Sequence, residues 1–140
     1  MVLSLYTEGY GYSKKLCEDV INWFIEKYLP RHKLEIEVLH RGLKREGALG
    51  WIDVAGETNK PRSFLIEMDT HLDKETYITV LCHELYHLKD FCLGNLKIKS
   101  CKRYYKGECI EDLEYWEQPS EIMAHWYERI LYQQYLTDTQ

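Results

Sequence analysis

The chain has 140 residues, of which 45% are hydrophobic and 29% are charged, a balance typical of a folded globular protein and not of a disordered or fibrous one. Its formal net charge of -5 at pH 7 disfavours nonspecific binding to nucleic acid, which would need a local basic patch. The length fits one domain, residues 1–140, that buries a substantial core.

The cysteines and the N-terminus bear on the cellular compartment. Five cysteines, an odd number without regular spacing, do not form the framework of a secreted disulfide-rich protein. The first residues lack the basic flank and long apolar run of a secretory signal, and no segment approaches the length of a membrane span. These features predict a soluble, cytoplasmic protein with reduced thiols and no membrane partner.

The N-terminal half predicts one helix followed by three strands. Residues 13–29 place apolar side chains on one helical face, with Ser13 as the N-cap. Residues 34–40 alternate apolar and charged side chains, which is typical of a strand with one solvent-exposed face. Residues 48–55 and 63–68 predict two further strands joined as a hairpin, so we expect a small mixed sheet of three or four strands.

The C-terminal half predicts two helices separated by a long segment. Asp73 or Thr76 can cap a helix that runs to about Phe91. Residues 96–115 show no sustained period and predict a long, partly ordered loop. A final helix is expected over residues 119–136, where apolar side chains form a broad stripe.

Residues 83–87 of the predicted second helix read His-Glu-Leu-Tyr-His. Four residues advance a helix by about 6 Å and return to within about 40° of the same face, so His83 and His87 can reach one zinc ion at about 2.0–2.1 Å. Glu84 is expected beside the ion as the general base, taking a proton from zinc-activated water and passing it to the leaving amine. The alternative is that both histidines are ordinary helix residues.

A zinc ion held by two histidines needs a third protein ligand. The final helix offers Glu121 and His125, which share a face because they are four residues apart. His125 can also be a partly buried histidine that packs near Trp126. Glu117 and Glu128 are expected to be solvent-exposed.

These two segments together resemble a known group of enzymes. Residues 81–88, Leu-Cys-His-Glu-Leu-Tyr-His-Leu, and residues 118–125, Gln-Pro-Ser-Glu-Ile-Met-Ala-His, resemble the minimal gluzincin peptidases. That group includes small phage and bacterial proteins near the SprT-like and ImmA-like families. Its pattern pairs an HExxH helix with a later helix carrying Glu-x-x-Ala. The two motifs match residue by residue, and the order of elements matches over roughly residues 15–135.

The resemblance implies a zincin-like α+β fold and a zinc metallopeptidase whose metal ligands are His83, His87 and Glu121. His125 is then the alternative third ligand, or a group that orients a ligand or stabilises the oxyanion, because SprT-like proteins proper use a third histidine. In a phage-encoded protein the compartment would be the cytoplasm of the host. The family also implies that a peptide or protein substrate pairs with the strand before the motif helix, residues 64–68, as an edge strand.

The segment over residues 97–106 mixes basic and tyrosine side chains and can bind nucleic acid or an acidic partner. A solvated loop is the simpler interpretation, and a loop that lies over the site could act as a lid. A second metal at Cys92, Cys101 and Cys109 is disfavoured because the spacing is not that of a zinc knuckle or ribbon. The alternative function is a non-catalytic or regulatory zinc module that binds a protein or nucleic acid through its edge strand or this segment.

Overall fold

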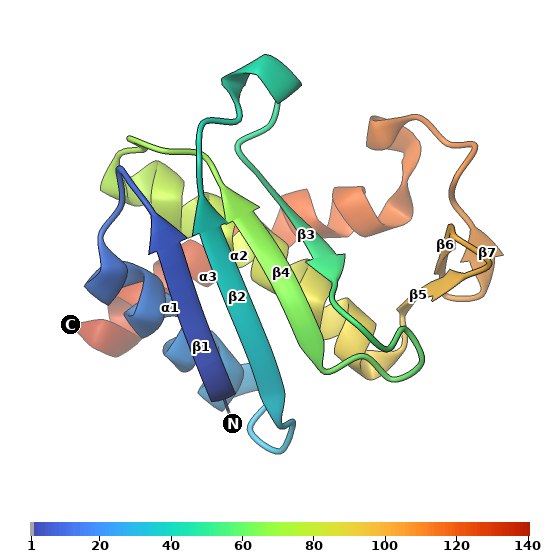
Figure 1. The fold of residues 1–140 in the computed structure, drawn as a ribbon, viewed down its shortest axis with the longest axis horizontal. Helices are drawn as coiled ribbons and strands as arrows, with labels where there is room; N and C mark the ends of the chain where they lie inside the picture. Colours follow the sequence, from blue (N-terminus) through green and yellow to red (C-terminus); the bar gives the residue numbers. More distant parts are fainter. Residues whose placement is uncertain (1) are drawn as a thin grey trace.

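The computed structural model describes residues 2–140 as an α+β fold, which confirms the expected fold class (Figure 1). The main sheet contains β1 (Val2–Gly9), β2 (Leu34–His40), β3 (Gly50–Val54) and β4 (Ser63–Met68), in the order β1-β2-β4-β3. The first, second and fourth of these strands are parallel, and β3 runs antiparallel to β4 at one edge. The sheet is therefore mixed and four-stranded.

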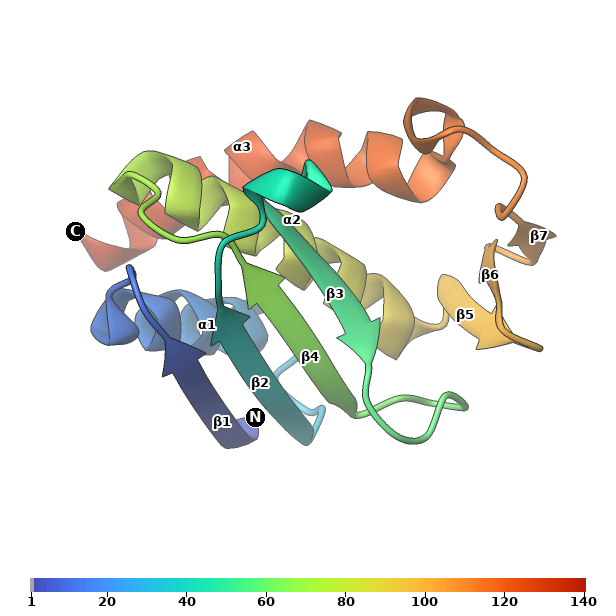
Figure 2. The same ribbon diagram turned by 45° about the horizontal axis from the view of Figure 1, so that its top comes forward.

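The helices cover one face of this sheet (Figure 2). The helices α1 (Lys14–Tyr28) and α2 (Lys74–Leu93) pack on the sheet, and α3 (Pro119–Thr139) packs against α2. On β2 the apolar Ile36 and Val38 are buried while Glu35 and Glu37 are exposed, so the opposite face meets solvent. No helix described between residues 2 and 140 has the length and apolar content needed to cross a membrane.

Most predicted elements of the N-terminal half are confirmed. The Oγ of Ser13 accepts a hydrogen bond from the Leu16 N–H at 3.2 Å, as an N-cap does. The strands over residues 34–40 and 63–68 have the expected bounds, and β3 is shorter than residues 48–55. Strand β1 was missed, because it lies at the other edge of the sheet and its largely exposed side chains give little alternation.

The prediction that residues 64–68 form an edge strand is wrong. Strand β4 lies between β2 and β3 and pairs with both. Its Phe64, Ile66 and Met68 are buried, as expected for an interior strand. The hairpin partner β3 occupies the edge instead, because the chain folds β3 back along the outside of β4. Any strand addition beside the motif helix therefore involves β3.

The motif helix begins and ends at clear capping residues. Of the two candidate caps, Asp73 is the N-cap, and its Oδ1 accepts a hydrogen bond from the Thr76 N–H at 2.7 Å. Gly94 ends the helix in the left-handed conformation, with φ of 82°. The helix runs two residues beyond Phe91, and α3 runs three residues beyond the expected end at residue 136.

The prediction of a long loop over residues 96–115 is wrong as well. It contains a second antiparallel sheet of β5 (Leu96–Lys99), β6 (Lys102–Tyr105) and β7 (Glu108–Cys109), followed by the 3-10 helix η2 (Tyr115–Glu117). Two consecutive residues with positive φ form each tight turn, Ser100 with Cys101 and Lys106 with Gly107. Strands this short give no detectable hydrophobic period, so the sequence pattern missed them.

Candidate metal centre

The motif histidines of α2 meet a carboxylate of α3. The Oε1 atom of Glu121 lies 3.0 Å from His83 Nε2 and 3.1 Å from His87 Nε2. Neighbouring ligand atoms around a tetrahedral zinc ion with bonds of about 2.0–2.1 Å are about 3.3 Å apart. The three side chains are also only 7%, 7% and 12% exposed. Three predicted site residues thus converge in a nearly dry position, with separations compatible with one zinc ion.

The remaining predicted residues lie next to this cluster. Two sets of three side chains each bring their potential metal-binding atoms within 4.8 Å of one another. One set is His83, Glu84 and His87, and the other is His83, Glu121 and His125. Every such group among the described residues contains His83, and none contains a cysteine. The structure therefore brings all five predicted residues to one place.

Glu84 is buried beside the two histidines. Burial raises the pKa of its carboxyl above the ordinary value, and the positive charges of His83, His87 and Arg103 oppose that rise. Its carboxylate takes no part in the hydrogen bonds that join His83 and His87 to Glu121 and Glu128. A carboxylate with a raised pKa is suited to accept a proton.

Glu128 belongs to the site, contrary to the expectation that it is solvent-exposed. Its Oε2 lies 2.8 Å from His83 Nδ1, and its side chain is only 21% exposed. Seven residues are nearly two turns of helix, so Glu121 and Glu128 share the face of α3 that packs on α2. Glu121, His125 and Glu128 occupy positions i, i+4 and i+7, and this helical spacing is the sequence feature from which Glu128 could have been predicted to lie in the site. Glu117 is exposed, as expected.

The two carboxylates fix the protonation of His83. A carboxylate only accepts hydrogen bonds, so Nδ1 donates to Glu128 and Nε2 donates to Glu121. Burial by itself would lower the pKa of His83, but these two hydrogen bonds outweigh it and raise the pKa to about 10. Burial would likewise raise the pKa of Glu121, but its bonds with both histidines hold this pKa well below the ordinary range.

His125 uses both ring nitrogens for other partners. Its Nδ1 lies 3.3 Å from Glu128 Oε1, and its Nε2 lies 2.9 Å from the Tyr115 hydroxyl. With a proton on Nδ1 directed at the carboxylate, Nε2 can accept a hydrogen bond from the Tyr115 hydroxyl. Its ring centroid nevertheless lies only 4.5 Å from that of His83.

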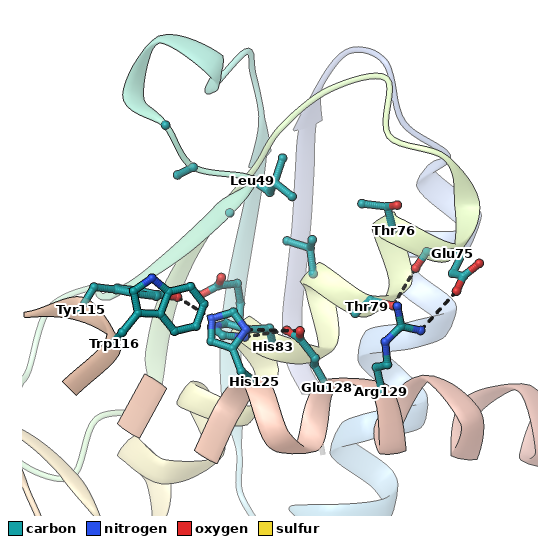
Figure 3. A pocket seen from close by; sticks show the side chains of 15 residues that line it. Leu49, Glu75, Thr76, Thr79, His83, Tyr115, Trp116, His125, Glu128 and Arg129 are labelled. Atoms are coloured by element: carbon teal, nitrogen blue, oxygen red, sulfur yellow. Dashed lines mark hydrogen bonds and ion pairs between the residues drawn. The ribbon is translucent and has the colours of Figure 1, made fainter. Parts of the chain in front are cut away.

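An open pocket of about 680 Å³ leads to this cluster (Figure 3). The pocket is lined by the loop that leads into β3 and by residues of α2, η2 and α3. The side chains labelled in Figure 3 are Leu49, Glu75, Thr76, Thr79, His83, Tyr115, Trp116, His125, Glu128 and Arg129. An ion pair of 3.6 Å between Arg129 Nη1 and Glu75 Oε1 flanks one side. Solvent and a small substrate group can therefore reach Glu84 and His83.

Comparisons of the chain with protein-family models, with curated proteins and with solved structures each find no match.

Close approach of α2 to β3 depends on a glycine. A Cβ added at Gly50 would lie 2.9 Å from Val80 Cγ1 and 3.2 Å from the Glu67 carbonyl. Val80 precedes His83 by three residues on the same helix. The glycine therefore allows the start of β3 to lie directly against the helix that carries the motif.

Proposed function

We propose that the protein is a zinc-dependent peptidase of the gluzincin type, with a zincin-like fold. His83, His87 and Glu121 bind the metal, and Glu84 is the general base. The observation that carries this proposal is the meeting of one Glu121 oxygen with the Nε2 atoms of both motif histidines. Two histidines and a glutamate form a known catalytic zinc set that leaves one coordination position open.

The surroundings of the cluster suit an ion that must also meet a substrate. Glu84 and His83 both line the open pocket, whereas His87 and Glu121 do not, and α3 packs on α2 at the cluster. A zinc ion in this position would polarise a carbonyl group and lower the pKa of a bound water to about 7. Glu84 would take the proton released by the attacking water and deliver it to the leaving amine nitrogen.

Tyr115 is suited to stabilise the developing oxyanion. Among the tyrosines of residues 2–140, Tyr115 lines the pocket together with Glu84 and His83. Burial and the nearby Glu121 raise the pKa of its hydroxyl, so it stays protonated at neutral pH. A protonated hydroxyl beside the reacting carbonyl can donate the hydrogen bond that the oxyanion needs.

The free edge of β3 supplies a place for an extended peptide. The Leu49 carbonyl accepts a hydrogen bond from the Asp69 N–H at the end of β4, at 2.8 Å. Bonded and non-bonded pairs alternate between antiparallel strands, so the backbone groups of Gly50, Ile52 and Val54 point away from β4. A peptide added along this edge would pass the pocket and the cluster, which suits strand addition.

Metal content and activity test the proposal together. Purified wild type should hold about one zinc ion per chain, and Glu121→Ala should lose most of it. Glu117→Ala is the matched control, because Glu117 is exposed and lies just before the same helix. Glu84→Gln should keep the zinc and lose cleavage of casein or a peptide library by about a thousandfold or more. Full zinc occupancy in Glu121→Ala would refute the proposed ligand set, and an active Glu84→Gln would refute the proposed base.

A non-catalytic zinc module is the second candidate, favoured by the exposed basic residues of the small β5-β6-β7 sheet. Such a module needs ligands but no base, so a carboxylate buried beside the ligands, as Glu84 is, has no role in that case. A protein that binds zinc but cleaves no member of a broad peptide library, with Glu84→Gln binding partners as wild type does, would favour the module.

A further inference from the structure

Side chains of the protein itself hold part of the free edge of β3. The Nη2 of Arg103 donates to the Ile52 carbonyl at 3.4 Å, and the Val54 N–H donates to the Asp53 carboxylate at 3.0 Å. Arg103 belongs to β6, so the small sheet reaches the edge along which a peptide would bind. A cation therefore lies against the middle of the β3 edge.

A basic groove of about 540 Å³ begins where β3 ends. The loop from β3 to β4, the end of α2 and strand β5 form its walls. Its charged lining residues are Lys60, Arg62, Lys97 and Lys99, and no acidic residue of the described chain lines it. The whole chain has a net charge of -5, so this local excess of positive charge runs against the overall balance.

Arg103 does not line this groove but lies beside it. Its guanidinium lies 6.0 Å from the centroid of the Phe91 ring, and Phe91 lines the groove. Its register partner in the small sheet, Ile98, lines the groove too. In both ribbon views the arrowhead of β3 lies on the side of the main sheet that faces the small sheet (Figures 1 and 2). We call Arg103 and the four basic residues of the groove the basic track.

We propose that the basic track selects peptides with acidic side chains on the side of the scissile bond that lies over Ile52 and Val54. This inference rests on the proposed peptidase function, because it assigns the substrate of the same site. At about 3.3 Å per residue, the acidic side chains fall about two to five residues from the scissile bond. A peptide carboxylate that draws Arg103 away from Ile52 also frees the carbonyl that main-chain pairing requires. Binding of the peptide carboxylate to Arg103 therefore also exposes the Ile52 carbonyl on the edge of β3.

The surroundings of the track favour a peptide over a nucleic acid. Acidic residues follow directly, at Glu108, Glu111, Asp112 and Glu114, and the Glu111 carboxylate accepts a hydrogen bond from the Arg103 N–H at 2.6 Å. These charges repel a long phosphate backbone. A short acidic segment needs only the track and the edge beside it.

Matched peptides test the selection by direct binding. A fluorescein-labelled peptide of about twelve residues, long enough for β3 and the groove, carries three Asp residues on one side of a central cleavable dipeptide. A second peptide has Asn in their place, and a third has the Asp residues on the other side. Fluorescence anisotropy with zinc-loaded Glu84→Gln, which holds peptides without cleaving them, should show about fivefold tighter binding of one Asp peptide than of the other two. The preference should weaken as salt rises.

Variants show which basic residues cause the preference for the Asp peptide. Arg103→Gln, and Lys97→Gln with Lys99→Gln, should bind the Asp and Asn peptides alike, whereas Lys14→Gln with Lys33→Gln, outside the groove, should keep the preference. Equal binding of all three peptides, or a preference unchanged in both track variants, overturns the proposal. Tighter binding of a single-stranded oligonucleotide that needs the same lysines also overturns it. Cleavage by wild type is scored separately, so absence of hydrolysis counts against the peptidase and not against the selection.

Discussion

Glu128 Oε2 accepts a hydrogen bond from His83 Nδ1 at 2.8 Å, so a carboxylate of α3 orients the first histidine of the motif on α2. The bond holds a proton on Nδ1 and directs Nε2 toward Glu121, at 3.0 Å. Carboxylate partners of this kind fix the tautomer of a metal-binding histidine and raise its basicity. Glu128 is therefore a positioning residue of the proposed centre.

Removal of the Glu128 charge should weaken zinc binding. We expect Glu128→Gln to lower the affinity for zinc by about ten- to a hundredfold, because His83 loses its charged partner. Competition with a chromophoric chelator measures the affinity. Glu26→Gln, which removes an exposed carboxylate from α1, is the control and should bind zinc as wild type does. An unchanged affinity in Glu128→Gln would contradict the positioning role.

Zinc binding should depend on pH through His83. Its pKa is raised to about 10 in the metal-free protein, so at neutral pH the ring carries a proton on Nε2 that must leave when zinc binds. The affinity should then rise about tenfold per pH unit between about pH 7 and 9. Calorimetry in buffers with different ionisation enthalpies should detect about one released proton from this ring. A flat affinity over this range would show that His83 is already neutral.

The stability of the metal-free protein should change with pH in the opposite sense. A histidine whose folded pKa of about 10 exceeds its ordinary value of 6.5 stabilises the fold fully below about pH 6.5. That contribution is lost as the pH rises through the folded pKa. The lowered pKa of Glu121 and Glu128 stabilises the fold above their ordinary value of 4.5 and is lost in acid. Thermal melts in a chelator should therefore peak near pH 5–6.5, and Glu128→Gln should flatten the alkaline side.

Tyr115→Phe should separate catalysis from metal binding. We expect kcat to fall about a hundredfold with unchanged zinc content, because the oxyanion loses one donor. Steady-state kinetics on a cleaved library peptide, with metal analysis, checks both numbers. Tyr127→Phe, whose ring stacks on Tyr86 outside the pocket, is the matched control. Equal loss in both variants would point to packing and not to the hydroxyl of Tyr115.

Asp69 should hold the loop that leads into β3. Its Oδ1 accepts hydrogen bonds from the Leu43 N–H at 3.0 Å and the Thr70 N–H at 2.9 Å, and the residue is buried. Asp69→Ala leaves two buried donors unpaired, which should destabilise the fold by about 1–3 kcal/mol in urea. Asp53→Ala removes an exposed carboxylate and should cost less. A loss in Asp69→Ala no larger than in Asp53→Ala would show that water satisfies both donors.

The parts of the fold that the sequence predicted correctly are those that depend on residues close together in the chain. The alternation over residues 34–40 and the cap at Ser13 depend on side chains a few positions apart, and both are confirmed. Residues 96–115 escaped prediction because their strands are two to four residues long and are fixed by turns. The position of β3 outside β4 escaped because the order of strands in a sheet leaves no periodic trace in the chain.

The sequence by itself determined that His83 and His87 share a helical face, because a spacing of four residues and the helical repeat are both local properties. Only the tertiary structure decided that Glu121, 38 and 34 residues farther along, meets both rings, that Glu128 orients one of them, and that Arg103 lies on the edge of β3. Such contacts depend on how whole elements pack, and packing is set by the sum of many side chains distributed over the chain.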